Sequence, residues 1–166
     1  MSRAFVKEGD QEEVPVIPPR AALPPGATNY VTPTGLEELL TELRELQKQK
    51  EELTLENETE QRIASTVLNG KINLLQERIA SAVVLNPDDS RGDAVRFGAT
   101  VTLKVVEKNQ IQKFQIVGVD EADIQKQKVA FVAPIAVAIT GKEVGEVAEL
   151  HLGKEVRKLE VKEINW

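Results

Sequence analysis

Two stretches of the chain carry apolar residues at alternating steps of four and three, the spacing typical of paired helices. Their seam positions are Leu39, Leu43, Leu46, Lys50 (which fills a gap) and Leu53 in the first stretch, and Leu68, Ile72, Leu75, Ile79 and Ala82 in the second. Thr32 is a good N-cap, Pro33 is favoured at the first helical position, and Pro87 ends the second stretch. The pattern predicts an antiparallel α-helical coiled-coil hairpin over residues 32–86.

The turn of this hairpin is indicated by a loss of apolar periodicity. No Gly or Pro lies between Leu36 and Asn69, and the segment TLENETEQ has the weakest apolar pattern. We therefore expect the tip near residues 54–61, where it is acidic. Arms of about 20–25 residues extend about 30–38 Å at 1.5 Å per residue, so the hairpin projects beyond a small neighbouring domain.

After residues 87–93, a linker of turn-forming residues, the apolar period changes to two. The first alternating run is Val95, Phe97, Ala99, Val101, Leu103 and Val105, and further strands are predicted at residues 112–119, 128–132, 146–152 and 156–164. Residues 134–140 are predicted as a short helix, although their apolar residues also alternate as in a strand. Residues 94–166 are thus a small, mostly β domain, and the fold class is α+β.

Residues 1–31 have little periodicity and contain five of the eight prolines. This composition predicts a Pro-rich flexible arm. In the alternative interpretation, the segment VPVIPPRAALPPG lies in a groove of a partner or of the C-terminal domain, because a polyproline conformation loses little entropy when it is fixed.

Composition excludes several classes of function. The chain has no cysteine, a single histidine (His151), 4% aromatic residues and a net charge of −6. Thiol chemistry, multi-histidine metal sites and direct binding of nucleic-acid phosphates are therefore not expected. No apolar run approaches the ~18 residues that span a bilayer, so we expect a cytoplasmic protein.

Three segments of the second half resemble the C-terminal domain of the Gre transcript-cleavage and elongation factors, GreA and GreB. They are FGATVTL (97–103), FQIVGVDEAD (114–123) and APIAVAITGKEVGE (133–146). TPTGLEELLTEL (32–43) and GKINLLQERIASAVVLN (70–86) resemble the opening and returning arms of the Gre coiled coil. The resemblance covers about residues 30–166, with a shortened coiled coil and a divergent tip. It implies an FKBP-like fold for the C-terminal domain.

The resemblance implies bacterial RNA polymerase as the partner. The C-terminal domain would bind the rim of the secondary channel, and the coiled coil would enter it, so nucleic acid is reached only through the polymerase. Acids at the tip would help the polymerase's own active site to bind a second Mg²⁺ and hydrolyse backtracked RNA. This chain would then be no enzyme itself and would carry no cofactor or metal of its own.

The candidate tip acids are Glu56, Glu58 and Glu60. Family tips carry an Asp, then two residues, then Glu-Asn; Glu56-Asn57 matches the second element, whereas Leu53 stands at the Asp position. In the C-terminal domain the resemblance marks candidate polymerase-binding residues, namely Asp120, Glu121, Asp123, Pro134 and Ile135. Ala133 and Val137 stand where the family commonly has Ser and Arg.

Parts of the sequence also suggest three other functions. The missing tip acid favours a Gre-like secondary-channel regulator or inhibitor without cleavage activity. The hairpin alone is also compatible with a coiled-coil scaffold or chaperone-like protein. A prolyl isomerase, suggested by the implied fold, is disfavoured because an aromatic pocket would have to be built from Phe97, Phe114, Phe131 and Trp166.

Overall fold

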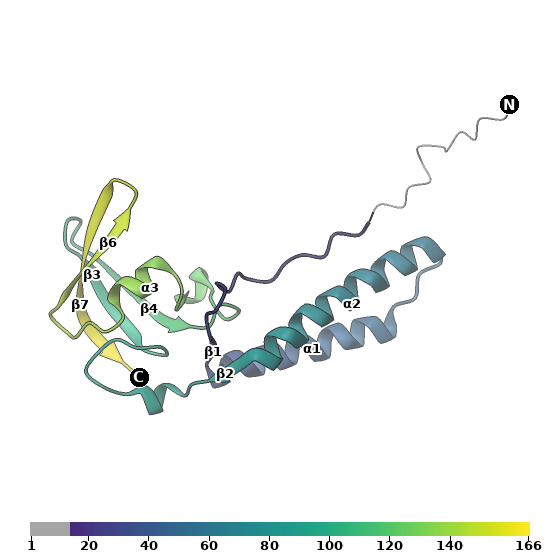
Figure 1. Ribbon diagram of the computed structural model, residues 1–166, viewed down its shortest axis with the longest axis horizontal. Helices are drawn as coiled ribbons and strands as arrows, with labels where there is room; N and C mark the ends of the chain where they lie inside the picture. Colours follow the sequence, from purple (N-terminus) through teal and green to yellow (C-terminus); the bar gives the residue numbers. More distant parts are fainter. Residues whose placement is uncertain (1–13) are drawn as a thin grey trace.

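The computed structural model describes residues 14–166, which form a helical hairpin and a curled β-sheet domain (Figure 1). In chain order the elements are β1 (Asn29–Val31), α1 (Pro33–Glu52), α2 (Glu58–Ser81), β2 (Ala82–Val84), η1 (Pro87–Ser90), β3 (Thr100–Val105), β4 (Gln110–Val117), η2 (Ile124–Lys126), β5 (Lys128–Ala130), α3 (Pro134–Ile139), β6 (Val147–Leu152) and β7 (Glu155–Asn165). The mixed helices and sheet agree with the predicted α+β class.

The hairpin consists of α1 and α2, joined by the loop 53–57. Thr32 caps α1 by accepting a hydrogen bond from the Gly35 amide, and Asn57 caps α2 by accepting from the amides of Thr59 and Glu60. The predicted seam is buried between the helices, since its residues Leu39, Leu46, Leu68, Ile72 and Leu75 form one apolar cluster with Val31. Periodicity therefore located the helical pair correctly, and the loop overlaps the predicted tip.

The second helix ends earlier than expected. It stops at Ser81, and residues 82–84 pair in parallel with β1 as strand β2. The Asn29 side-chain amide donates to the Arg78 carbonyl at 2.9 Å and to the Ser81 hydroxyl at 3.2 Å. These bonds satisfy the Arg78 carbonyl and the Ser81 hydroxyl in the last turn of α2. The next residues, 82–84, form backbone hydrogen bonds with β1 instead of continuing the helix. The prediction of helix as far as residue 86 was wrong for this reason.

The predicted flexible arm, residues 1–31, also needs correction. Residues 1–13 lie outside the described residues. Within the rest, Asn29–Val31 is a strand, and residues 14–28 run beside the hairpin, with Ile17 against Gly70 and Arg20 paired with Glu42 (Figure 1). The alternative interpretation placed this segment in a groove of a partner or of the C-terminal domain, whereas residues 17–23 lie mainly along the hairpin, and Arg20 reaches Asp120 of the C-terminal domain.

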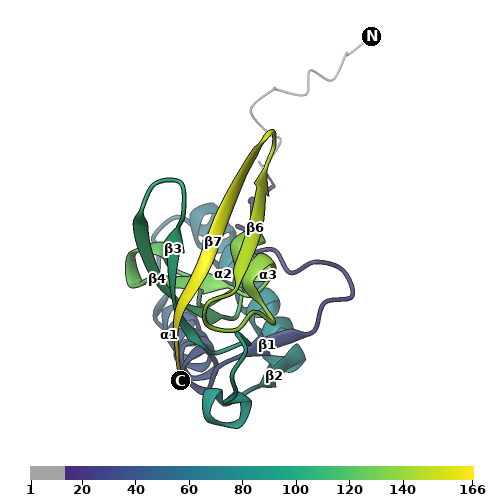
Figure 2. The same cartoon turned by 90° about the vertical axis from the view of Figure 1, so that its left-hand side faces the viewer.

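The C-terminal domain is a five-stranded sheet of order β5-β4-β3-β7-β6, in which β4 and β5 are parallel and the other neighbours antiparallel. Four of its strands lie within two residues of their predicted positions, whereas the first predicted run, Val95–Val105, is strand only from Thr100 onward and its residues 95–99 form a loop and turn. Figure 2 looks towards this domain, with the hairpin behind it. Residues 134–139 are helical, so the open choice between helix and strand is settled, and Ala136 and Ile139 of α3 pack in the sheet core.

No helix within residues 14–166 is long and apolar enough to cross a membrane.

Candidate functional site

The hairpin tip carries three exposed acids at the end of the molecule farthest from the sheet domain (Figure 1). Glu56 lies in the loop, whereas Glu58 and Glu60 lie in the first turn of α2. Carboxylates at this end of a helix are favoured by the helix dipole. Within the described part of the chain, none of the three side chains has a hydrogen-bond or ion-pair partner, so all three are available to a ligand.

The loop between the helices is held by Gln61. Its side-chain amide donates to the Leu53 carbonyl at 3.0 Å, and its Oε1 accepts from the Leu55 amide at 2.7 Å. Leu53 packs against the hairpin core. Glu56 is therefore the sole acid of residues 53–57 and lies on the solvent side of an ordered turn.

Across residues 14–166, no three His, Asp or Glu side chains gather closely enough to hold a metal ion. A divalent cation at the tip would therefore require most of its oxygen ligands from another molecule. Mg²⁺ in proteins is commonly bound by only one or two carboxylates, and water or substrate oxygens complete its coordination. The tip can supply a carboxylate to a cation that a partner already holds.

The predicted docking residue Asp120 points into the molecule. Its side chain is 6% exposed and lies 3.0 Å from Arg20 Nε and 3.4 Å from Arg78 Nε. Arg20 comes from the N-terminal segment and Arg78 from α2, so this carboxylate of the sheet domain joins two other parts of the chain.

Glu121 has a similar role one residue later. Its side chain is 3% exposed, the Thr32 hydroxyl lies 2.9 and 2.8 Å from its two oxygens, and Lys128 Nζ lies at 3.4 Å. Thr32 also caps α1. Because a hydrogen bond to a buried charged group is stronger than one between neutral groups, Glu121 fixes the base of the hairpin to the sheet domain.

Aromatic packing completes this junction. The Tyr30 ring lies 5.9 Å from that of Phe97 and 5.6 Å from that of Phe131, separations at which tilted rings attract each other. A Cβ at residue 118 would stand 2.6 Å from the Tyr30 carbonyl oxygen, so Gly118 permits the close approach of the two segments. We call Tyr30, Thr32, Phe97, Glu121 and Phe131 the junction.

The remaining docking candidates differ in exposure. Asp123 is half-buried and caps η2 by accepting from the Gln125 amide, Pro134 is exposed at the start of α3, and Ile135 packs against the sheet core. Two neighbours in sequence are apolar and exposed, Ile124 at 90% and Val137 at 61%. Of the predicted set, Asp120 and Glu121 are therefore buried, Asp123 and Ile135 are half-buried, and Pro134 is exposed.

Comparison with known proteins decides the family. Residues 89–165 match the family model described as "Transcription elongation factor, GreA/GreB, C-term". Over 151 residues the chain is 31% identical to the transcription elongation factor GreA of Bartonella henselae, and the match covers 82% of this chain and 96% of that relative. The chain belongs to the GreA/GreB family.

Other GreA/GreB relatives match over a shorter region. Identity is 35% over 99 residues with GreA of Maricaulis maris and 40% over 94 residues with GreA of Hyphomonas neptunium. These matches cover 60% and 57% of this chain and span 63% and 60% of the relatives' length. The solved structure of GreA factor homolog 1 from Thermus thermophilus is 20% identical, with a TM-score of 0.40, and the match covers 84% of this chain and all of that one.

The sequence did not reveal the partners that this GreA/GreB family member uses at its junction. The sequence places Arg20 and Tyr30 in the predicted arm and predicts Thr32 as an N-cap, and no sequence pattern points to Arg78. A weak signal existed, because two acids, Asp120 and Glu121, adjoin a strand whose residues are buried. A carboxylate that is buried beside such a strand requires a cation or a hydrogen-bond donor, such as a hydroxyl, as its partner.

Replacing Glu121 by Ala is expected to lower the free energy of unfolding by about 2 kcal/mol, the cost of leaving buried polar partners without a bond. Both Thr32 and Lys128 lose the carboxylate they share. Urea unfolding of the two proteins measures the difference. Glu38→Ala, which removes an exposed acid of α1, is the matched control and should change stability by less than about 0.5 kcal/mol. Equal losses in the two variants would contradict the role of Glu121.

Proposed function

We propose that this chain is a transcription elongation factor that binds bacterial RNA polymerase in the cytoplasm and inserts its hairpin into the secondary channel. The observation that carries the proposal is a GreA/GreB C-terminal domain joined through a buried junction to a projecting hairpin with an exposed acidic tip. The relatives named above are called transcription elongation factors. In this proposal the hairpin is a Gre-type coiled coil, and the sheet domain is FKBP-like.

The tip would act on a cation held by the polymerase. An Mg²⁺ ion held there would supply the activation of water for attack on the RNA phosphate. Glu56 would contribute a carboxylate oxygen from the loop, and Glu58 and Glu60 would add negative charge beside it. The chain itself would supply no catalytic centre. The hydrolysis of backtracked RNA would remain the polymerase's own reaction.

The candidate docking residues would have two different roles, direct contact with the polymerase and orientation of the hairpin. Asp123 and Pro134 are accessible enough to contact the polymerase, and Ile135 would support Pro134 from below. Asp120 and Glu121 have buried carboxylates, so we assign them an indirect part in binding. They would set the direction in which the hairpin leaves the docked domain.

One observation favours a second candidate, a secondary-channel regulator or inhibitor without cleavage activity. The resemblance to the family places a second acid at residue 53, and here Leu53 packs into the hairpin core. A tip with one loop carboxylate could occupy the channel without completing the cation site.

RNA cleavage in stalled bacterial elongation complexes tests the proposal. Binding to polymerase is measured first, by co-elution of the purified chain with the enzyme. Binding with faster cleavage supports the cleavage factor, and binding without faster cleavage supports the regulator. A chain that does not bind would overturn both and leave a scaffold or chaperone-like role.

A further inference from the structure

Arg20 of the N-terminal segment bridges the two parts of the molecule. Its Nη1 and Nη2 donate to the two carboxylate oxygens of Glu42 at 2.7 and 3.0 Å, and its Nε donates to Asp120 at 3.0 Å. Such a two-pronged arginine–carboxylate pair fixes orientation as well as distance. The hydrogen bond to Glu42 raises the pKa of Arg20, against the opposing effect of burial. One side chain thus ties α1 to the loop after β4.

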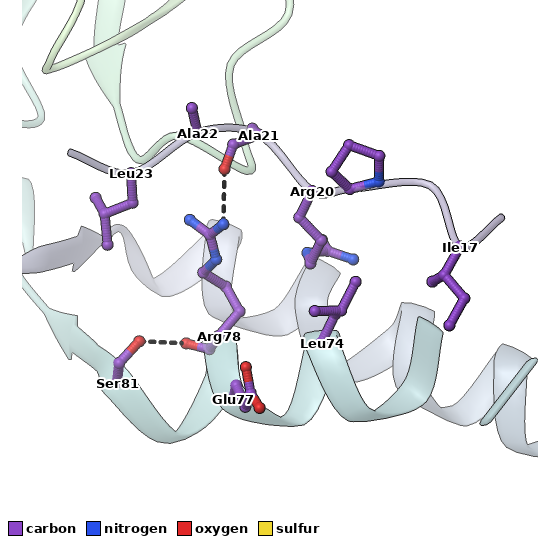
Figure 3. A pocket seen from close by; sticks show the side chains of 10 residues that line it. Ile17, Arg20, Ala21, Ala22, Leu23, Leu74, Glu77, Arg78 and Ser81 are labelled. Carbon is purple, nitrogen blue, oxygen red and sulfur yellow. Dashed lines mark hydrogen bonds between the residues drawn. The ribbon is translucent and has the colours of Figure 1, made fainter. Parts of the chain in front are cut away.

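Asp120 depends on this bridge. Among the described residues, Arg20 makes the one hydrogen bond to its carboxylate, while the Arg78 contact is a longer ion pair of 3.4 Å. Arg78 is itself tied to the arm, because it donates to the Ala21 carbonyl at 2.6 Å (Figure 3). Both helices and the sheet domain therefore meet at residues 20–21.

The segment is also fitted to α2 by shape. A Cβ at residue 70 would lie 2.1 Å from Ile17 Cδ1, so Ile17 occupies space that every residue except glycine would fill. The chain between Ile17 and Leu23 then follows Leu74 and Arg78 along α2 (Figure 3) and lines one side of an open pocket of about 430 Å³. A glycine inside a helix lowers helix stability by roughly 1 kcal/mol relative to Ala. The contact with Ile17 explains why Gly70 stands at this position of α2.

The bridge acts at a distance from the junction. Glu42 lies ten residues after Thr32 in α1, or about 15 Å further along the helix axis at 1.5 Å per residue. A single attachment at the hairpin base would allow the hairpin to pivot. A second attachment about 15 Å away opposes that rotation.

We propose that residues 17–21 form a clasp that fixes the angle between the hairpin and the sheet domain, and that breaking the Arg20 bridge lets the hairpin swing while both parts stay folded. The clasp is a property of the free chain. Its failure would therefore leave the proposed function standing.

Distances between spin labels in the full chain test this proposal. Because the chain has no cysteine, Gln49→Cys near the tip and Lys154→Cys in the β6–β7 turn place one label on each part. The parent protein is expected to give one narrow distance peak. Arg20→Ala should lose that narrow peak and give a broad distribution, with unchanged far-ultraviolet circular dichroism.

Two further variants sharpen the result. Arg44→Ala removes an exposed arginine of α1, the helix that contains Glu42. Among the described residues Arg44 bonds only Thr41, so this variant should keep the narrow peak. Gly70→Leu retains Arg20 but displaces Ile17, so it should broaden the distribution without weakening α2. A narrow peak in Arg20→Ala, a broad peak in the parent, or loss of helical signal in Arg20→Ala would each overturn the clasp.

Discussion

Glu56→Gln is expected to reduce stimulated RNA cleavage by about 10- to 100-fold, the loss usually seen when a supporting partner of a bound metal is removed. Glu56 is the one acid of residues 53–57, and its side chain is exposed. Glutamine keeps the size and one oxygen but removes the charge that a divalent cation attracts. The measurement is the rate of cleavage in stalled elongation complexes at saturating factor.

Glu45→Gln is the control for this substitution. It removes the same charge from an exposed position of α1 away from the tip, and it should leave the cleavage rate unchanged. Both variants should bind polymerase as tightly as the parent. If the two variants stimulate cleavage by the polymerase equally well, Glu56 does not assist the cation. If the parent itself does not stimulate cleavage, the regulator is the better account.

Leu75→Ala is expected to lower the free energy of unfolding by about 2–5 kcal/mol, the range for a large-to-small change in a packed core. Leu75 is 0% exposed and lies in the apolar cluster that joins the helices to Val31. The substitution removes this packing and leaves a cavity at the hairpin base. Urea unfolding followed by circular dichroism measures the loss.

Leu40→Ala provides the comparison, because Leu40 is 37% exposed on the same hairpin. Its expected cost is about 1 kcal/mol or less. A cost for Leu75→Ala no larger than that for Leu40→Ala would show that the helices do not pack as described.

Local periodicity explains what could be predicted from the sequence. Leu39, Leu43 and Leu46, and likewise Leu68, Ile72 and Leu75, follow one another at steps of four and then three. This spacing can be read from neighbouring residues, and it predicts the buried seam between the helices. The alternation from Val101 to Val105 predicted a strand in the same way. Neither inference required knowledge of a distant part of the chain.

The junction and the clasp depend on contacts between distant residues. Arg20 and Asp120 are 100 positions apart, and Thr32 and Glu121 are 89 apart. In sequence, acids that follow a strand look like a solvated loop, and nothing local shows which cations or hydroxyls they meet. Strand β1 has three residues, too few to show a period, so its pairing with β2 was missed as well.

The entry of the tip into the polymerase is tested most directly by crosslinking. Thr54→Cys places a single thiol in the tip of the cysteine-free chain, where a photoactivatable crosslinker can be attached. In complexes with bacterial RNA polymerase, we expect crosslinks to polymerase residues that line the secondary channel near the catalytic Mg²⁺. Crosslinks confined to the outer surface of the polymerase, or none despite binding, would contradict the account.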